Sequence, residues 1–257
     1  MSQLQLSFFL AFLCVLGLAG AGCRPYVSEF QGWLRRAVAV LLLTGILAVA
    51  VFLPVTSFGQ ADEIDPDTIW FPSLLAGHLV LATFLLLWWR LRADTSLAAF
   101  LHLGSGRWWG KIRSGMAAGC TGWLATVTVT GAAAGLVSLA GQAAPSTEVS
   151  PLIVWLAKLP IPHRLIMIAA AMTVEEAFFR GFLQPRFGLA LSSLFFALSH
   201  FSYGLPFMIV GVFTVSLVIG RTFQRSGDLL PCVIAHGIFD AMQLLIVLPL
   251  AVDLVLD

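Results

Sequence analysis

The chain has 257 residues, of which 59% are hydrophobic and only 11% are charged. Soluble domains average about 25% charged residues, so this composition excludes an ordinary soluble protein and indicates a polytopic membrane protein. The formal net charge of +1 provides no bulk field that would recruit nucleic acid. The four cysteines form no CxxC pair, and we interpret them as packing residues rather than as a disulfide framework.

Eight apolar runs are candidates for membrane-spanning helices, which need about 20 mostly apolar residues each. The first run follows an N-terminus without Lys or Arg, which favours a retained span over a cleaved signal peptide. The sixth run is short, and we expect it to be tilted or packed inside the bundle. The sequence therefore predicts an all-α, multi-pass transmembrane bundle of about eight spans. The runs cover residues 4–22, 37–54, 69–89, 115–140, 165–182, 188–202, 205–220 and 229–250.

The charges between these runs alternate along the chain. Residues 23–36 and 90–113 are rich in Arg and Lys, whereas residues 55–68 carry four acidic residues and no basic one. Under the positive-inside rule this places the N-terminus outside and turns Arg180 toward the cytoplasm. The stretch 151–164 breaks the pattern, because it carries two basic residues beside prolines, and we interpret it as an interfacial helix.

Two small-residue motifs and one histidine lie in the first four runs without ionisable companions. Gly115 and Gly119, like Gly131 and Gly135, are spaced so that helix backbones can approach closely, and we predict a packing role for them. His78 is alone in the third run, and we predict a packed or pore-facing residue rather than a catalytic one. The sequence contains no Walker, dinucleotide-binding or HExxH motif.

Adjacent carboxylates mark the fifth run. Glu176 and Arg180 are four residues apart, so they share a helix face and can form an ion pair. Glu175 is rotated by about 100 degrees from its neighbour and needs a partner from another span. Ionisable side chains at membrane depth are costly and rare, so they favour a functional interpretation.

Further ionisable residues end or interrupt the later runs. His200 ends the sixth run and is the nearest candidate partner for Glu175, while His236 and Asp240 are four residues apart in the eighth. The alternative interpretation is a set of structural salt bridges that hold the bundle together. That alternative suits the i,i+4 pair of the fifth run better than it suits the whole set. Four further ionisable groups at membrane depth would cost too much free energy to be explained by packing alone.

Three motifs occur here in the order and at the spacing of a known family. They are EEAFFR at 175–180, FALSH at 196–200 and HGIFD at 236–240. The series resembles the CAAX-protease and bacteriocin-processing family of intramembrane proteases. The resemblance covers about residues 165–248, the last four runs, and we therefore predict an N-terminal scaffold over 1–150 and a protease core over 151–257.

The resemblance implies a role for each motif residue. Glu175 would act as the general base on a water that it holds together with His200. His236 and Asp240 would polarise the scissile carbonyl and stabilise its oxyanion, with Phe196 packed behind the first histidine. The implied catalytic residues are Glu175, His200, His236 and Asp240, and the implied supporting residues are Glu176, Arg180 and Phe196.

One position departs from the family pattern. Relatives often have Asn where this chain has Asp240, and an ionised Asp cannot donate to an oxyanion. Asp240 would then either orient His236 or complete a metal-ligand set with Glu175, His200 and His236. Because the chain lacks HExxH, we favour a metal-independent mechanism without a cofactor, and zinc stays the open alternative.

The resemblance predicts an intramembrane endopeptidase of the bacterial inner membrane. Its partners would be the lipid bilayer and a membrane-anchored protein or peptide, cut near the cytoplasmic half of the bilayer. A prenylated tail, a leader peptide and a C-terminal sorting anchor are all open as substrates. The first alternative is a non-catalytic bacteriocin-immunity or scaffold protein of the same fold. The second is a proton-coupled transporter, which would usually show two matched halves, whereas all motifs here lie in the second half.

Overall fold

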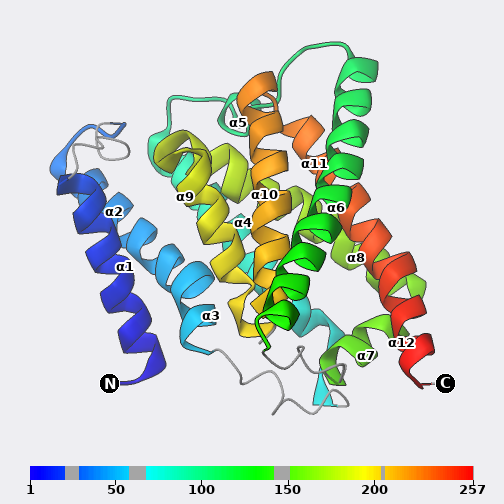
Figure 1. Cartoon of the computed structure of the whole chain (residues 1–257). Coiled ribbons are helices and arrows are strands. Elements are labelled where there is room, and N and C mark those ends of the chain that lie inside the picture. The colour runs from blue at the N-terminus through cyan, green and yellow to red at the C-terminus, as the bar shows by residue number, and fades with distance from the viewer. Residues whose placement is uncertain (21–28, 58–67, 142–150, 204–205, 257) are drawn as a thin grey trace.

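The protein was analysed as a computed structural model, which describes residues 1–20, 29–57, 68–141, 151–203 and 206–256. Within these residues all regular structure is helical, which confirms the predicted all-α class. Figure 1 shows a bundle of helices whose two chain termini lie at the same end.

Seven helical segments make up the described residues of the N-terminal part. The helix that begins as α2 continues through a π-helical turn into α3, and η4 leads directly into α4. α4 is capped at its C-terminus by Ala93, which adopts a left-handed conformation with φ 62°, and the side chain of Ser96 caps the N-terminus of α5. The segments are α1 (Gln3–Gly20), α2 (Trp33–Leu47), η1 (Ala48–Phe52), α3 (Leu53–Thr56), η4 (Phe71–Leu75), α4 (Ala76–Arg92) and α5 (Leu97–Phe100).

The remaining helices form the other side of the bundle. The long helix α6 packs along both α10 and α11, and the short helix α7 packs against α12. The segments are α6 (Trp108–Leu139), α7 (Pro151–Lys158), α8 (Ile161–Ala170), η5 (Ala171–Glu175), η6 (Ala177–Leu183), α9 (Gln184–Ser199), η7 (Phe201–Tyr203), α10 (Pro206–Ser226), α11 (Leu229–Met242), η8 (Gln243–Val247) and α12 (Leu248–Leu256).

Every predicted apolar run falls on a helix, and the protein is an integral membrane protein. Five helical stretches in the described residues are long and apolar enough to cross a membrane, and α1 adds a shorter apolar helix. The fifth and sixth runs form one helical stretch from α8 to α9, which is not among the five. A break between them was predicted, and it takes the form of a kink at Gly188, with φ 79° and ψ 173°. This backbone conformation is open essentially to glycine alone.

Basic residues gather at one end of the bundle, called here the basic end. It is the end at which α2, α6 and α11 begin and α4 and α10 finish (Figure 1). Arg180 is not among its residues, because that side chain is fully buried inside the bundle, and its direction toward the cytoplasm stays a prediction. Ten of the chain's 14 lysines and arginines lie there: Arg35, Arg36, Arg90, Arg92, Arg107, Lys111, Arg113, Arg186, Arg221 and Arg225.

The end of the bundle where α1 begins and α3 and α9 finish is called the opposite end. The stretch 151–164 lies there as α7 and the start of α8 (Figure 1). Its position at a membrane interface stays a prediction.

Aromatic rings join the N-terminal helices to η6. Phe84 lies 5.7 Å from Phe178 and 4.9 Å from Phe182, and Trp88 lies 4.8 Å from Phe182 and 5.2 Å from Phe30, measured between ring centroids. All five side chains are at most 4% exposed. Edge-on packing of this kind adds about 0.5–1.5 kcal/mol per pair beyond area burial, so the two parts of the chain are held firmly together.

The first small-residue motif lies at the contact of α6 with α11. A Cβ atom added at Gly115 would lie 2.7 Å from the Cβ of Ile234, and one added at Gly119 would lie 2.8 Å from the backbone oxygen of Ala235. The predicted close approach is therefore present at this pair. At the second pair, which includes Gly135, an added Cβ would meet nothing within 4 Å in the described residues, so the same spacing serves no helix contact there.

We expect Gly119→Ala to lower the thermal unfolding midpoint in detergent, because the new methyl group forces α6 away from α11. Overpacking of this kind costs about 1–3 kcal/mol. Gly135→Ala is the matched control, and it should leave the midpoint unchanged or raise it, since Ala favours a helix over Gly by up to about 1 kcal/mol. Equal midpoints for the two variants would contradict the contact.

Candidate functional site

A cavity of about 450 Å³ lies between the N-terminal helices and the stretch that carries the glutamates. Most of its wall is apolar, and its lining comes from η1, α3, η4, α4, η5, η6, α9 and η7. A concave apolar wall with a few converging polar groups is typical of a ligand site. The polar side chains that line it are His78, Glu175, Ser199, His200 and Ser202.

Glu175 projects into this cavity and is held by a residue of α4. Its Oε1 lies 3.0 Å from Nε2 of His78, and the two side chains are 15% and 21% exposed. Its Oε2 is buried and has no hydrogen-bond partner among the described residues. Among the described residues, the hydrogen bond of Glu175 is to His78, and His200, the partner that the sequence predicts, lies on the same cavity wall.

His78 is the site residue that the sequence analysis missed. It lies 97 positions before Glu175 and belongs to no motif. The only available signal was its presence as an ionisable residue within an apolar run, which was the argument applied to the motif residues.

His200 lies on the same cavity wall, at the end of α9. Its Nδ1 is 2.8 Å from the backbone oxygen of Phe196 and 3.1 Å from Oγ of Ser199. A carbonyl oxygen only accepts, so Nδ1 carries a hydrogen and donates it. In the neutral ring Nε2 is then an acceptor. The ring also packs on that of Phe196 at 4.8 Å.

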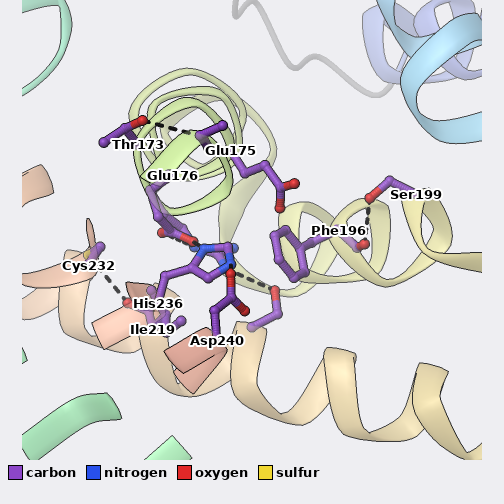
Figure 2. Close-up of polar contacts among 12 residues, drawn as sticks. Thr173, Glu175, Glu176, Phe196, Ser199, Ile219, Cys232, His236 and Asp240 are labelled. Atoms are coloured by element: carbon purple, nitrogen blue, oxygen red, sulfur yellow. Dashed lines mark hydrogen bonds and ion pairs between the residues drawn. The ribbon is translucent and has the colours of Figure 1, made fainter. Parts of the chain in front are cut away.

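A second polar group forms a chain of four side chains behind the cavity. Nε of Arg180 donates to Oε2 of Glu176 at 3.0 Å, so the predicted i,i+4 pair is present. Oε1 of Glu176 lies 2.9 Å from Nδ1 of His236, whose Nε2 lies 3.3 Å from Oδ2 of Asp240. Figure 2 shows Glu175 and Glu176 leaving their helix in different directions, the second toward His236. The backbone on either side of Glu176 is π-helical, a feature that often marks functional sites.

Positive and negative groups alternate along this series of four side chains. Both ring nitrogens of His236 face carboxylate oxygens, an arrangement that favours a ring protonated on both nitrogens, an imidazolium. Arg180 and Glu176 are completely buried. With Asp240 ionised, two positive and two negative groups balance. Pairing and hydrogen bonding of this kind are what make buried charges tolerable.

Phe196 lies between the two polar groups. Its ring is 4.8 Å from the ring of His200, 5.8 Å from that of His236, and 5.1 Å from Cζ of Arg180. The predicted catalytic residues therefore divide into two places. Glu175 and His200 line the cavity, whereas His236 and Asp240 belong to the buried chain next to it.

The zinc alternative needs four of these residues to converge on one ion. Within the part of the chain that the structure describes, no three His, Cys, Asp or Glu side chains are arranged to hold a metal. Both nitrogens of His236 are directed at carboxylates, and Nδ1 of His200 donates to a backbone oxygen. In this arrangement Glu175, His200, His236 and Asp240 do not form one ligand set.

Comparison with known proteins confirms the resemblance of the motif-bearing segment. Residues 157–242 match the family described as "Type II CAAX prenyl endopeptidase Rce1-like", and they contain all three motifs. Over 86 residues the chain is 35% identical to "Uncharacterized protein YpbD" of Bacillus subtilis (strain 168), which covers 33% of this chain and 46% of that protein. The chain thus aligns with about half the length of this relative. No solved structure gives a significant match.

The matched segment does not contain the whole cavity. His78 and the lining residues of η1, α3 and η4 lie before residue 157. The division into a scaffold over 1–150 and a protease core over 151–257 stays a prediction, and the scaffold half contributes a hydrogen-bonding side chain to the cavity.

Replacing Glu176 by Gln should destabilise the fold much more than replacing Glu175 by Gln. The first change leaves Arg180 and His236 with only one countercharge between them, and loss of one partner from a buried ion pair costs about 3–5 kcal/mol. The second keeps a hydrogen-bonding group beside His78 at a partly exposed position. Thermal unfolding of the two purified variants tests this, and similar midpoints would show that the charge balance does not stabilise the bundle.

Proposed function

We propose that this protein is an intramembrane endopeptidase that hydrolyses a peptide bond of a membrane-associated substrate with a water activated by Glu175 and His200. The observation that carries the proposal is the state of the Glu175 carboxylate. One oxygen is fixed by His78, and the other has no partner in the described residues, on a wall shared with His200. The match of residues 157–242 to a CAAX endopeptidase family supports the same class of chemistry.

The proposed reaction uses the two cavity residues in turn. The Glu175 carboxylate accepts a proton from water while the water oxygen attacks the scissile carbonyl carbon. Nε2 of His200 accepts a hydrogen bond from the second water hydrogen and so aligns the nucleophile. Glu175 then delivers its proton to the amide nitrogen, the C–N bond breaks, and a carboxylic acid and an amine are released. General-base catalysis of this kind contributes about 100- to 10,000-fold in rate.

His78 acts in this proposal as a positioning residue. A hydrogen bond from Nε2 to Oε1 of Glu175 stabilises the carboxylate and fixes its plane beside His200. A carboxylate placed to within a fraction of an ångström is a more effective base than a mobile one.

The buried chain would support the site through charge and position. It links the π-helical stretch to α11 through His236 and to α10 through the bond from Arg180 to Oγ of Ser216 at 3.2 Å. The imidazolium of His236 would favour negative charge that develops on the substrate carbonyl, and Asp240 would hold that ring in place. We favour this metal-independent chemistry because neither nitrogen of His236 points toward Glu175 and the chain lacks HExxH.

Glu175→Ala and His200→Ala should each reduce cleavage at least about 100-fold while the protein still accumulates in the membrane, because each removes a group that contacts the water. Mass spectrometry of membrane proteins from cells expressing each variant measures this. Wild-type activity in the presence of a chelator is the control for the metal-independent mechanism. Full turnover by Glu175→Ala would exclude the general-base role, and a wild-type chain without any cleavage product would favour the non-catalytic scaffold.

His78→Leu should lower kcat by about 10- to 100-fold with little change in KM, as loss of an orienting partner does at comparable sites. His78→Gln should recover part of the loss, because its amide nitrogen can donate to Oε1 of Glu175 from a similar position. A purely structural role predicts instead that both variants lose stability and activity in parallel. Steady-state kinetics with an unfolding midpoint for each variant distinguish the two cases.

A further inference from the structure

We propose that the catalytic cavity opens at the extracytoplasmic end of the bundle and that its substrate is the membrane anchor of an exported protein, cut in the outer half of the bilayer. The direction of access follows from the fold and from the distribution of basic residues, without reference to activity. The substrate class rests in addition on the proposed protease function.

The cavity lies nearer the opposite end than the basic end. α4 runs from the first to the second, and His78 is 14 residues before Arg92, which at 1.5 Å per residue is about 20 Å from the basic end. The cavity wall also includes Pro54, two residues before α3 finishes, Leu74 in η4, and Ser202 in η7 after α9. These positions extend the cavity from Glu175 toward the opposite end.

Toward the basic end the same space is filled. Phe178 and Phe182 follow Glu175 along the helix, and Phe84 and Trp88 follow His78 along α4. Phe84 packs against both phenylalanine rings and Trp88 packs against Phe182, so these rings lie between the polar pair and the basic end. Each ring is at most 4% exposed.

An arginine layer covers these rings. Cζ of Arg186 lies 4.0 Å from the centroid of the Phe182 ring, and its Nη2 donates to both carboxylate oxygens of Glu29 at 2.9 and 3.0 Å. Arg92 lies 3.6 Å from the same carboxylate. Access from the basic end would require these packed layers to separate.

The charge distribution then assigns the two ends to the two sides of the membrane. The basic end holds ten of the chain's 14 lysines and arginines, whereas the sequence between α3 and η4 has four acidic residues and no basic one. The positive-inside rule places the basic end in the cytoplasm. The cavity therefore faces the outside, which differs from the cleavage near the cytoplasmic half that the sequence analysis expected and disfavours a cytoplasmic prenylated tail.

A second, apolar groove indicates where the anchor would lie. It has a volume of about 590 Å³, is lined by α1, α2, η1 and α4, and shares Val49 and Val80 with the catalytic cavity. From these shared residues it continues along α4 to Leu87, toward the basic end. In an exported protein with a C-terminal anchor, the main part of the protein lies outside and the anchor lies in the membrane. Its scissile bond would therefore lie in the cavity, and its apolar anchor would lie along the groove. Hydrolysis leaves a carboxylate on the exported part and an amine on the anchor.

Labelling of single cysteines tests the direction of access without reference to activity. In a chain with all four native cysteines replaced and an unchanged unfolding midpoint, Ser202→Cys probes the cavity wall. Ser105→Cys, exposed between α5 and α6 at the basic end, is the matched control. With a membrane-impermeant maleimide applied to the outer face of the inner membrane, Ser202→Cys should react at least about tenfold faster than Ser105→Cys. After the membrane is opened, both should react. Reaction of Ser105→Cys alone from outside, or of Ser202→Cys only after opening, would overturn the proposal.

Mass spectrometry of new protein termini tests the substrate class. Cells with the wild-type chain, but not with Glu175→Ala, should contain exported proteins whose C-termini lie at the outer edge of a former anchor. New termini on cytoplasmic tails would overturn this inference while supporting the protease. Termini that do not depend on Glu175, together with outer labelling at position 202, would refute the protease and its substrate but leave the access direction standing.

Discussion

The alternating chain of Arg180, Glu176, His236 and Asp240 is the constraint on which the rest of the structure depends. A single uncompensated charge would be expensive inside a membrane protein, and here four groups from two helical stretches neutralise one another within 3.3 Å contacts. These contacts form only when α11 and the π-helical stretch lie at one fixed separation and rotation relative to each other. It therefore sets the geometry of the bundle core on which the cavity is built.

Glu175 illustrates why two adjacent glutamates have different tasks. Its neighbour Glu176 is completely buried and engaged on both oxygens, whereas Glu175 is partly exposed, engaged on one oxygen, and directed into a cavity. Adjacent positions on a helix point in different directions, so one carboxylate can stabilise the fold while the other stays available for chemistry. The aromatic rings beside them fill the space on one side of the cavity.

Local features of this protein were predictable from sequence, and features that depend on helix packing were not. The apolar runs and the Glu176–Arg180 pair follow from spacing along one helix. The contact of His78 with Glu175 joins positions 97 residues apart. It depends on how α4 lies against η5, which no motif records. The direction of His236 depends on the rotation of α11 about its axis, and the spacing of Gly131 and Gly135 matches that of Gly115 and Gly119 although only the latter pair meets a neighbouring helix.

The kink at Gly188 has a consequence for how the site is assembled. The helical stretch that carries Glu175 runs toward the basic end, and the backbone reverses direction at Gly188. α9 then runs back beside that stretch, so that His200 at its end lines the same cavity. The two cavity residues that we assign to catalysis therefore share a depth because a single residue adopts a backbone conformation that other amino acids rarely adopt. A side chain at position 188 would touch neither of them, yet it would alter their separation. The geometry of the candidate site thus depends on a residue that has no side chain.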